Sequence, residues 1–344
     1  MGAQDTRAAG RAGRARSAST ALSSARGAIF PGAGAACQNG AMEHDRRTFV
    51  LATLGIGGAL PLGACALRAA GPRQLFDLSL AEWSLHRRLH AGELDARDFA
   101  PLARAEWDFA AVEHVNTFFM DKAEDQAYLD DMKRRADDAG VHSLLIMCDA
   151  EGELGDADEG ARRRAVENHH KWIRAARHLG CHSIRVNAGG QGTREEVSKR
   201  AAKSLHALAT YGDPLAIDVI VENHGGYSSD GAWLAATIRA ADHARAGTLP
   251  DFGNFQLGNG EWYDRYKGVE ELMPFARGVS AKSHEFDAAG NETRTDYRRM
   301  LRIVLDAGYH GFVGVEYEGE AVSEPEGIRL TRDLLVRVRA ELAG

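Results

Sequence analysis

The chain has 344 residues, a hydrophobic content of 44% and a formal net charge of −7 at pH 7. Its length suits one large domain with additional segments, and its apolar fraction is sufficient for a sizeable core. The acidic balance argues against a protein that binds nucleic acid through a basic face, and no stretch is long and apolar enough to predict a transmembrane helix.

The N-terminal region predicts disorder followed by an export signal. Residues 1–44 are rich in Ala, Gly, Arg and Ser and show no apolar period, which is typical of disorder. Residues 45–68 carry a twin arginine, Arg46-Arg47, ahead of a short Gly- and Ala-rich apolar run, and this resembles a twin-arginine export signal. Because Met42 stands where such a signal would begin, we interpret Met42 as the candidate true start of the protein and residues 1–41 as the result of a misassigned start site.

The four cysteines do not form a disulfide framework. The segment Leu62-Gly-Ala-Cys65 resembles a lipoprotein processing box with Cys65 as the lipidated residue, and the alternative is a small-residue cleavage site with an incidental cysteine. Cys37 also precedes the predicted domain. Cys148 ends one predicted strand and Cys181 begins the next, so both are expected to be buried at opposite ends of a parallel sheet, beyond disulfide reach. We therefore expect an exported protein that is periplasmic or anchored to the membrane by a lipid on Cys65.

From Leu75 onward the chain alternates between short apolar runs and longer amphipathic segments. The apolar runs predict strands at residues 75–80, 111–116, 141–148, 181–187, 217–222, 248–251, 279–284 and 312–316. The amphipathic segments predict helices at residues 99–107, 125–139, 159–179, 194–210, 231–244, 268–276, 296–307 and 326–342. Eight strands, each followed by a helix, predict a single α/β domain over residues 75–344, a (β/α)8 TIM barrel, whose usual length is about 250 residues.

Four polar residues stand at the ends of the last four predicted strands. They are Glu222, Asp251, His284 and Glu316, separated by about 30 residues each, or one βα unit. A barrel brings the C-terminal ends of its strands to one mouth. Three carboxylates and an imidazole in one pocket need a compensating cation, so these residues predict a metal site. A donor set of three oxygens and one nitrogen suits Mn²⁺, Co²⁺ or Mg²⁺ better than a structural zinc. The alternative is that one or two of these four residues are helix caps or surface loop residues.

Other residues near the same strand ends are candidate substrate ligands. His224 lies two residues beyond Glu222, and Asn254 lies three beyond Asp251; each is expected either to contact substrate or to anchor its loop. Asn116 and Asn187 end earlier strands and are expected to bind the hydroxyl groups of a polyol, and alternation places His114 and Arg185 one layer below them on the pocket side.

Three further features concern the walls of the expected pocket. Lys282 shares the face of His284 and is expected beneath the metal as a counter-charge, with catalysis as the alternative. Trp262 lies in the insertion 256–267, which is a candidate lid, and is expected either to contact substrate or to pack within its loop. Glu82 and Trp83 follow the first strand and are expected to form a wall.

The pattern of Glu222, Asp251, His284 and Glu316 on the last four strands resembles the xylose-isomerase-like superfamily of sugar isomerases and epimerases. The resemblance covers about residues 75–344 and is nearest to ketose 3-epimerases, hydroxypyruvate isomerases and inosose-processing barrels. It implies that these four residues bind one divalent metal and that Glu222 and Glu316 act as acid and base. Tagatose-type epimerases carry a histidine where this chain has Asn254 and an arginine where it has Gly290.

The expected function is a metal-dependent sugar isomerase or epimerase that acts on a ketose or keto-sugar through an enediolate. The alternatives are a lyase or dehydratase acting on a 3-keto-sugar or keto-glycoside, and a non-catalytic sugar-binding lipoprotein. The expected partner is a small sugar, without nucleic acid, and a homo-oligomer is compatible with the sequence. The apurinic-endonuclease branch of the same barrels is disfavoured by the acidic charge and the export signal.

Overall fold

The computed structural model describes residues 74–344, so the predictions made for Cys37, Cys65 and the twin arginine lie outside it. None of the helices in this range is both long and apolar enough to cross a lipid bilayer.

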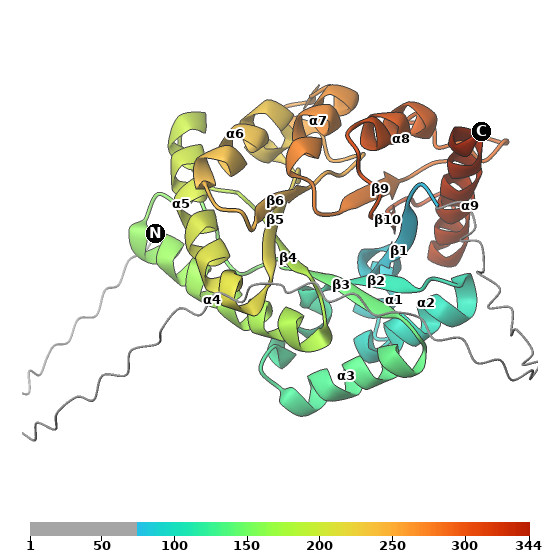
Figure 1. The fold of residues 1–344 in the computed structure, drawn as a ribbon, viewed down its shortest axis with the longest axis horizontal. Helices are drawn as coiled ribbons and strands as arrows, with labels where there is room; N and C mark the ends of the chain where they lie inside the picture. The colour runs from blue at the N-terminus through green and yellow to red at the C-terminus, as the bar shows by residue number, and fades with distance from the viewer. Residues whose placement is uncertain (1–73) are drawn as a thin grey trace, which may run out of the picture. The chain divides into compact units, whose positions relative to one another are not determined.

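An eight-stranded parallel sheet forms the centre of the domain. Its strands run in the order β6-β5-β4-β3-β2-β1-β10-β9. Their bounds are β1 Asp77–Ala81, β2 Ala111–Val115, β3 His142–Met147, β4 Ser183–Val186, β5 Asp218–Glu222, β6 Ala246–Leu249, β9 Val279–Ser283 and β10 Phe312–Tyr317. Figure 1 shows these strands surrounded by helices. The predicted (β/α)8 TIM barrel is confirmed.

The barrel closes between β6 and β9 through single bridges instead of a continuous ladder. Thr248 bridges Ala276 and Asp251 bridges Ser280, both in parallel. The Ser280 amide donates to the Pro250 carbonyl at 2.9 Å. Pro250 has no N–H, so it cannot donate in return, and this interrupts the ladder. Strand β6 therefore ends at Leu249 although the chain stays paired as far as Asp251.

The helices follow the strands as predicted, and two match their predicted bounds. The helices are α1 His86–His90, α2 Phe99–Trp107, α3 Gln126–Asp138, α4 Glu159–Leu179, α5 Arg194–Gly212, α6 Gly231–Ala241, α7 Arg265–Leu272, α8 Tyr297–Asp306 and α9 Glu324–Ala343. Short 3₁₀ helices lie at Glu82–Leu85, Ala96–Asp98, Asn116–Lys122, Asp213–Leu215, Gly226–Ser229 and Met273–Phe275. The predicted bounds of α2 and α4 are reproduced. Asp158 caps α4 by accepting from the Ala161 amide, which explains the sharp start of that helix.

The insertion after β6 forms a small antiparallel hairpin. Strands β7 (Gln256–Gly258) and β8 (Glu261–Trp262) pair with each other and not with the barrel. Asn259 and Gly260 in the turn both have positive φ, 52° and 81°. Asn-Gly is the preferred sequence for such a tight hairpin turn. The insertion is therefore a built element of the structure.

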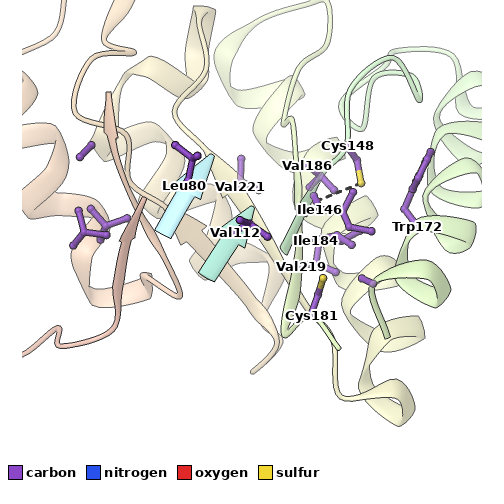
Figure 2. Close-up of a cluster of buried hydrophobic side chains, with 14 of the residues drawn as sticks. Leu80, Val112, Ile146, Cys148, Trp172, Cys181, Ile184, Val186, Val219 and Val221 are labelled. Atoms are coloured by element: carbon purple, nitrogen blue, oxygen red, sulfur yellow. Dashed lines mark hydrogen bonds between the residues drawn. The ribbon is translucent and has the colours of Figure 1, made fainter. Parts of the chain in front are cut away.

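The core has two layers, one on each side of the strands. The inner core fills the barrel and consists of Ala81, Val115, Leu145, Met147, Ile220 and Leu249. The outer layer packs between strands and helices, and Figure 2 shows part of it, with Ile146, Ile184 and Val219 near Trp172 of α4. Both faces of most strands are thus buried, as in other all-parallel sheets.

Cys148 and Cys181 are free and buried in the outer layer, as predicted. Burial raises the pKa of the Cys181 thiol to about 12 and that of Cys148 well above its usual value. Neither thiol is therefore a thiolate at neutral pH, which agrees with a packing role.

The direction of side chains along β2 corrects one prediction. His114 does not face the pocket. Its ring packs between Phe99 and Phe119 outside the sheet, and its Nε2 lies 2.9 Å from Ser143 Oγ. Glu113 faces the barrel interior in its place. A strand buried on both faces lacks the polar alternation that would reveal its phase.

Candidate metal centre

Three carboxylates converge at the C-terminal mouth of the barrel. Glu222 ends β5, Asp251 follows β6, and Glu316 lies in β10. One oxygen of each lies within 4.8 Å of the others. The three residues are at most 3% exposed. Such a concentration of buried negative charge is unfavourable unless protons or cations balance it.

Neighbouring strands explain why these residues meet. Strand β5 pairs with β6, so Glu222 lies opposite Leu249, two residues before Asp251. Strand β10 pairs with β9, so Glu316 lies opposite Lys282. Because all the strands are parallel, residues at their C-terminal ends face the same mouth.

Ser280 connects two of the carboxylates. Its hydroxyl lies 2.8 Å from Asp251 Oδ2 and 2.6 Å from Glu316 Oε2. A hydroxyl carries one proton, so it can donate to only one of these oxygens at a time. The other oxygen requires a further proton or a cation.

The second oxygen of Asp251 organises the loop that follows. It accepts from the backbone amides of Gly253 and Asn254 at 2.8 and 2.7 Å. The Asn223 amide accepts from the Asp251 N–H at 2.8 Å and donates to the Asp251 carbonyl at 3.0 Å. Asp251 is therefore held in one orientation, with Oδ2 turned toward Ser280.

Two buried cations flank the carboxylates. Arg185 Nε lies 2.9 Å from Glu222 Oε2, and the Arg185 guanidinium donates to Asp149 Oδ1 at 2.7 Å. Lys282 Nζ lies 3.3 Å from Glu316 Oε1 and 3.2 Å from Glu318 Oε1. Lys282 thus lies where a counter-charge was expected, between two glutamates.

The electrostatics of the cluster follow from burial and these partners. Burial raises the pKa of Glu222 to about 7; Arg185 opposes that shift and Glu316 adds to it. Burial likewise raises the pKa of Asp251 to about 7, against the opposing charge of Lys282. Burial lowers the pKa of Lys282, but Glu316 and its neighbouring carboxylates hold it well above its usual value. Lys282 is therefore a cation and not a nucleophilic amine.

His284 lies apart from the three carboxylates. Of the residues that the structure describes, the group with ligand atoms all within 4.8 Å contains Glu222, Asp251 and Glu316, and not His284. The His284 Nδ1 lies 3.0 Å from the Ser283 carbonyl oxygen. Ligation by this histidine stays a prediction.

The donor set fits a hard divalent cation. Three carboxylates offer oxygen ligands, and the buried Glu222 Oε2 is paired with Arg185 Nε at 2.9 Å without a well-directed hydrogen bond. Counting the flanking Asp149 and Glu318, five acidic groups face two basic ones, Arg185 and Lys282. Carboxylate oxygens with this excess of negative charge suit Mg²⁺ or Mn²⁺.

The predicted substrate ligands do not all lie together: one contacts the carboxylate cluster, two line the adjacent cavity, and the others lie outside both. Asn254 Nδ2 donates to Glu222 Oε1 at 3.1 Å. Asn187 and His224 line a cavity of about 610 Å³ beside the cluster. Asn116 is fully buried, and its amide exchanges hydrogen bonds with the Asp149 main chain at 3.0 and 2.9 Å. Trp262 is 55% exposed on the hairpin.

Of the two residues after β1 that were expected to form a wall, Trp83 lies at the mouth and Glu82 does not. Trp83 stacks on Phe118 with ring centroids 5.8 Å apart, and both rings pack against the inner core at the mouth. Glu82 is fully buried and accepts from the Val115 amide at 2.8 Å, so it supports β2 from within.

Sequence reasoning missed four polar residues of this region. Ser280 and Glu318 share the inward faces of Lys282 and Glu316 by alternation, so their positions could have been found. Asp149 lies two residues beyond the end of β3. Glu113 had no such signal, because β2 is buried on both faces.

Comparisons with known proteins agree with this architecture. A family model described as "Xylose isomerase-like TIM barrel" matches residues 102–337. A D-tagatose 3-epimerase-like protein has a TM-score of 0.61 at 16% identity, covering 78% of this chain and 100% of that chain. An L-ribulose 3-epimerase has a TM-score of 0.58 at 16% identity, with 78% and 98% covered.

A xylose isomerase-like TIM barrel protein from Mycobacterium smegmatis, in complex with magnesium, has a TM-score of 0.58 at 15% identity, with 78% and 98% covered. Because the sequence identities are only 15–16%, the similarity to these structures shows a shared fold. No curated protein matches the sequence significantly.

Proposed function

The chain belongs to the xylose isomerase-like TIM barrel family, and from this membership we propose that it is a divalent-metal-dependent sugar isomerase or epimerase acting on a ketose or keto-sugar. The observation that carries the proposal is the convergence of Glu222, Asp251 and Glu316 at the barrel mouth. The fold shared with a D-tagatose 3-epimerase-like protein and an L-ribulose 3-epimerase supports a sugar as substrate.

The carboxylates of Glu222, Asp251 and Glu316 would hold one divalent ion, with His284 as the predicted fourth ligand. Mn²⁺, Co²⁺ and Mg²⁺ are the candidates, and the magnesium complex of the M. smegmatis protein supports a hard cation. When bound, such an ion stabilises the negative charge that develops on a substrate carbonyl oxygen.

Glu222 and Glu316 are the proposed base and acid. One carboxylate removes the proton on the carbon beside the carbonyl, and the C–H electron pair forms the C=C bond of an enediolate while the carbonyl oxygen becomes negative. The other glutamate, which starts as the protonated carboxylic acid, returns a proton. Return to the opposite face of the same carbon gives the epimer, and return to the former carbonyl carbon gives the isomer. Arg185 and Lys282 keep the two glutamates in place through their ion pairs.

Solvent isotope exchange tests this function. The Mn²⁺-loaded protein, incubated with a panel of keto-sugars in D₂O, is expected to place deuterium at the α-carbon without elimination. Glu222→Gln and Glu316→Gln should each slow this exchange on the order of 10²–10⁴-fold, because each removes a proton-transfer group. Glu106→Gln, on the exposed face of α2, serves as the control. Unchanged exchange in both active-site variants would contradict the acid–base roles of Glu222 and Glu316, whereas no exchange by the natural protein would leave only a sugar-binding role.

The same assay separates the second candidate, a lyase acting on a keto-glycoside. If a leaving group stands β to the carbonyl, the electron pair of the enediolate expels it. Release of the leaving group, with loss of the α-hydrogen as the C=C bond forms and without deuterium in its place, would then replace epimerisation as the reaction. The large cavity beside the carboxylates is the feature that keeps this alternative open.

We propose in addition that the protein is exported by the twin-arginine route. This proposal rests on Arg46-Arg47 and on the segment that ends in Cys65. N-terminal sequencing of the mature protein, with mass analysis for a lipid on Cys65, tests both the signal and the anchor. An unprocessed chain that begins before Met42 would contradict the proposal.

A further inference from the structure

Building on the proposed function, we infer that the natural substrate is a glycoside: the reacting sugar carries a second, neutral ring, which the cavity beside the carboxylates accommodates. The inference rests on the position, the walls and the charge of this cavity.

The cavity lies beyond the ends of β4 and β5, beside the three carboxylates but not lined by them. At about 610 Å³ it lies within the range of about 300–1,000 Å³ that is common for ligand pockets. Its inner end is formed by Asn187 and His224. Asn187 donates to Asp149 Oδ1 at 2.8 Å, and Asp149 binds the same Arg185 that pairs with Glu222. The outer end reaches Leu257 of the hairpin. A ligand seated here is therefore adjacent to the reacting group and separate from it.

Five of the residues that line the cavity are glycines, so the backbone forms part of its wall. Gly225 and Gly226 have φ of 88° and 58°, and a Cβ added to either would meet no atom within 4 Å. On the other side, the Gly155 amide donates to the Gly189 carbonyl at 2.7 Å, and an added Cβ on Gly189 or Gly190 would collide with the facing loop. The loops after β3 and β4 are thus locked together, and the cavity is already formed in the folded chain.

The charge of the lining favours a neutral ligand. Among the described residues, no lysine or arginine lines this cavity, and Glu153 contributes a carboxylate. The nearby Arg194 is engaged by Asp230 at 2.5 Å, and Arg200 donates to the carbonyls of Gly155 and Gln191. A phosphate group would find no free cation here and would be repelled by Glu153.

The remaining side chains suit a ring with hydroxyl groups or an aromatic ring. Tyr227 and Leu257 supply apolar surface, and Asn187, Gln191 and His224 supply polar groups. The ring nitrogens of His224, which lines the cavity, can exchange hydrogen bonds with a hydroxyl. This combination of an apolar surface and a few polar groups is typical of small-molecule sites.

Calorimetry of the Mn²⁺-loaded protein tests the inference without requiring turnover. The ligands are an unoxidised disaccharide, an aryl glycoside, the corresponding monosaccharide and its 6-phosphate. We expect both two-ring ligands to bind at least ten-fold more tightly than the monosaccharide, and the phosphate to bind no better than the monosaccharide. Gln191→Trp and Leu257→Trp, which narrow the cavity from opposite sides, should each weaken two-ring binding at least ten-fold and leave monosaccharide binding unchanged.

Glu106→Trp, on the far helix α2, controls for an added indole, and thermal unfolding of each variant checks that it folds. The inference would be overturned if one-ring and two-ring ligands bound with equal affinity, or if the phosphate bound most tightly. It would also be overturned if no sugar bound, or if the tryptophan variants lost affinity equally for both ligand types. Tight two-ring binding without deuterium exchange in the earlier assay would instead contradict the enzymatic function and leave the ligand class standing.

Discussion

Glu113 lies inside the barrel, one layer below the carboxylate cluster. Its carboxylate occupies the space that Gly314 leaves open, and Gly314 precedes Glu316 by two residues on the same strand. Burial raises the pKa of Glu113 to about 8, with further contributions from the charges of Glu316 and Glu222, while a hydrogen bond from Ser79 opposes the shift. Glu113 is therefore largely protonated at neutral pH.

The raised pKa of Glu113 predicts a pH-dependent free energy of unfolding. The unfolded chain ionises Glu113 near 4.5 and the folded chain near 8, so its stabilising contribution is complete below pH 4.5 and is lost as pH rises toward 8. The shift sets an upper limit of about 5 kcal/mol. Glu113→Gln should remove this part of the pH dependence in denaturant titrations at pH 5, 6.5 and 8. Parallel pH profiles for the variant and the natural chain would contradict the assignment.

Gly314 provides a second test of the same packing. A Cβ at this position would lie 2.6 Å from Glu113 Oε1, so Gly314→Ala should destabilise the fold by about 1–3 kcal/mol through overpacking. In the double variant with Glu113→Ala the clash is absent. The loss in free energy of unfolding of the double variant should therefore be smaller, by more than about 0.5 kcal/mol, than the sum of the losses of the two single variants. Additive losses in chemical denaturation would show that the two sites do not compete for space.

At the scale of elements, side-chain caps define where the barrel helices start. Asp158 accepts from the Ala161 amide at the start of α4, and Asp230 and Asp296 act in the same way for α6 and α8. Each of these caps ends the loop between a barrel strand and the following helix, and these loops carry the candidate site. The caps therefore also fix where those loops end.

Removal of one cap has a defined expected cost. Asp158→Ala leaves the first amides of α4 without their acceptor and should lower the free energy of unfolding by about 1 kcal/mol. Glu167→Ala, an exposed position within the same helix, should change it by less than about 0.5 kcal/mol. Equal losses for the two variants, measured by urea denaturation, would exclude a capping role.

The β7–β8 hairpin is the element best placed to cover a ligand. Trp262 is 55% exposed, and its main neighbour is the Arg265 guanidinium, 5.9 Å from the ring centre. Trp262→Ala should leave the free energy of unfolding within about 0.5 kcal/mol while weakening sugar binding about 2- to 13-fold, the range expected for one aromatic contact. Val336→Ala, at the other exposed large apolar side chain within residues 74–344, is the matched control. If ligand affinity is unchanged in both variants, the hairpin does not act as a lid.

At the scale of the whole molecule, the barrel is held together at its mouth by opposite charges. Glu222 lies on β5, Glu316 lies on β10 and Asp251 lies just after β6, and the β6–β9 seam beside them is joined by single bridges. A cation bound by all three would therefore link strands across the weakest part of the barrel.

Metal binding should accordingly raise the thermal stability of the folded domain. An ion present at 100 times its Kd adds about 2.7 kcal/mol, so Mn²⁺ should raise the Tm and a chelator should reverse the change. Asp251→Asn, measured in the same scans, should abolish the response to Mn²⁺ because it removes one of the three charged ligands. A Tm that is independent of Mn²⁺ in the natural chain would contradict the metal site.

Local patterns in the sequence were enough to determine the elements of the barrel and the three acidic strand ends. Helix α4 illustrates the reason: the capping Asp158, the apolar period and the terminal Gly180 all lie within the segment that they define. Glu222, Asp251 and Glu316 follow short β-branched or apolar runs, and a parallel barrel needs no further information to bring such ends to one mouth.

Only the tertiary structure decided which side chains share the site. Whether Glu113 or His114 faces the interior depends on the phase of a strand buried on both sides, which leaves no mark in the composition of β2. The pairing of Arg185 with Glu222, the Ser280 hydroxyl between two carboxylates and the cavity beside Asn187 depend on distances between strands far apart in sequence. Those distances are set by register and barrel closure, and no single segment contains them.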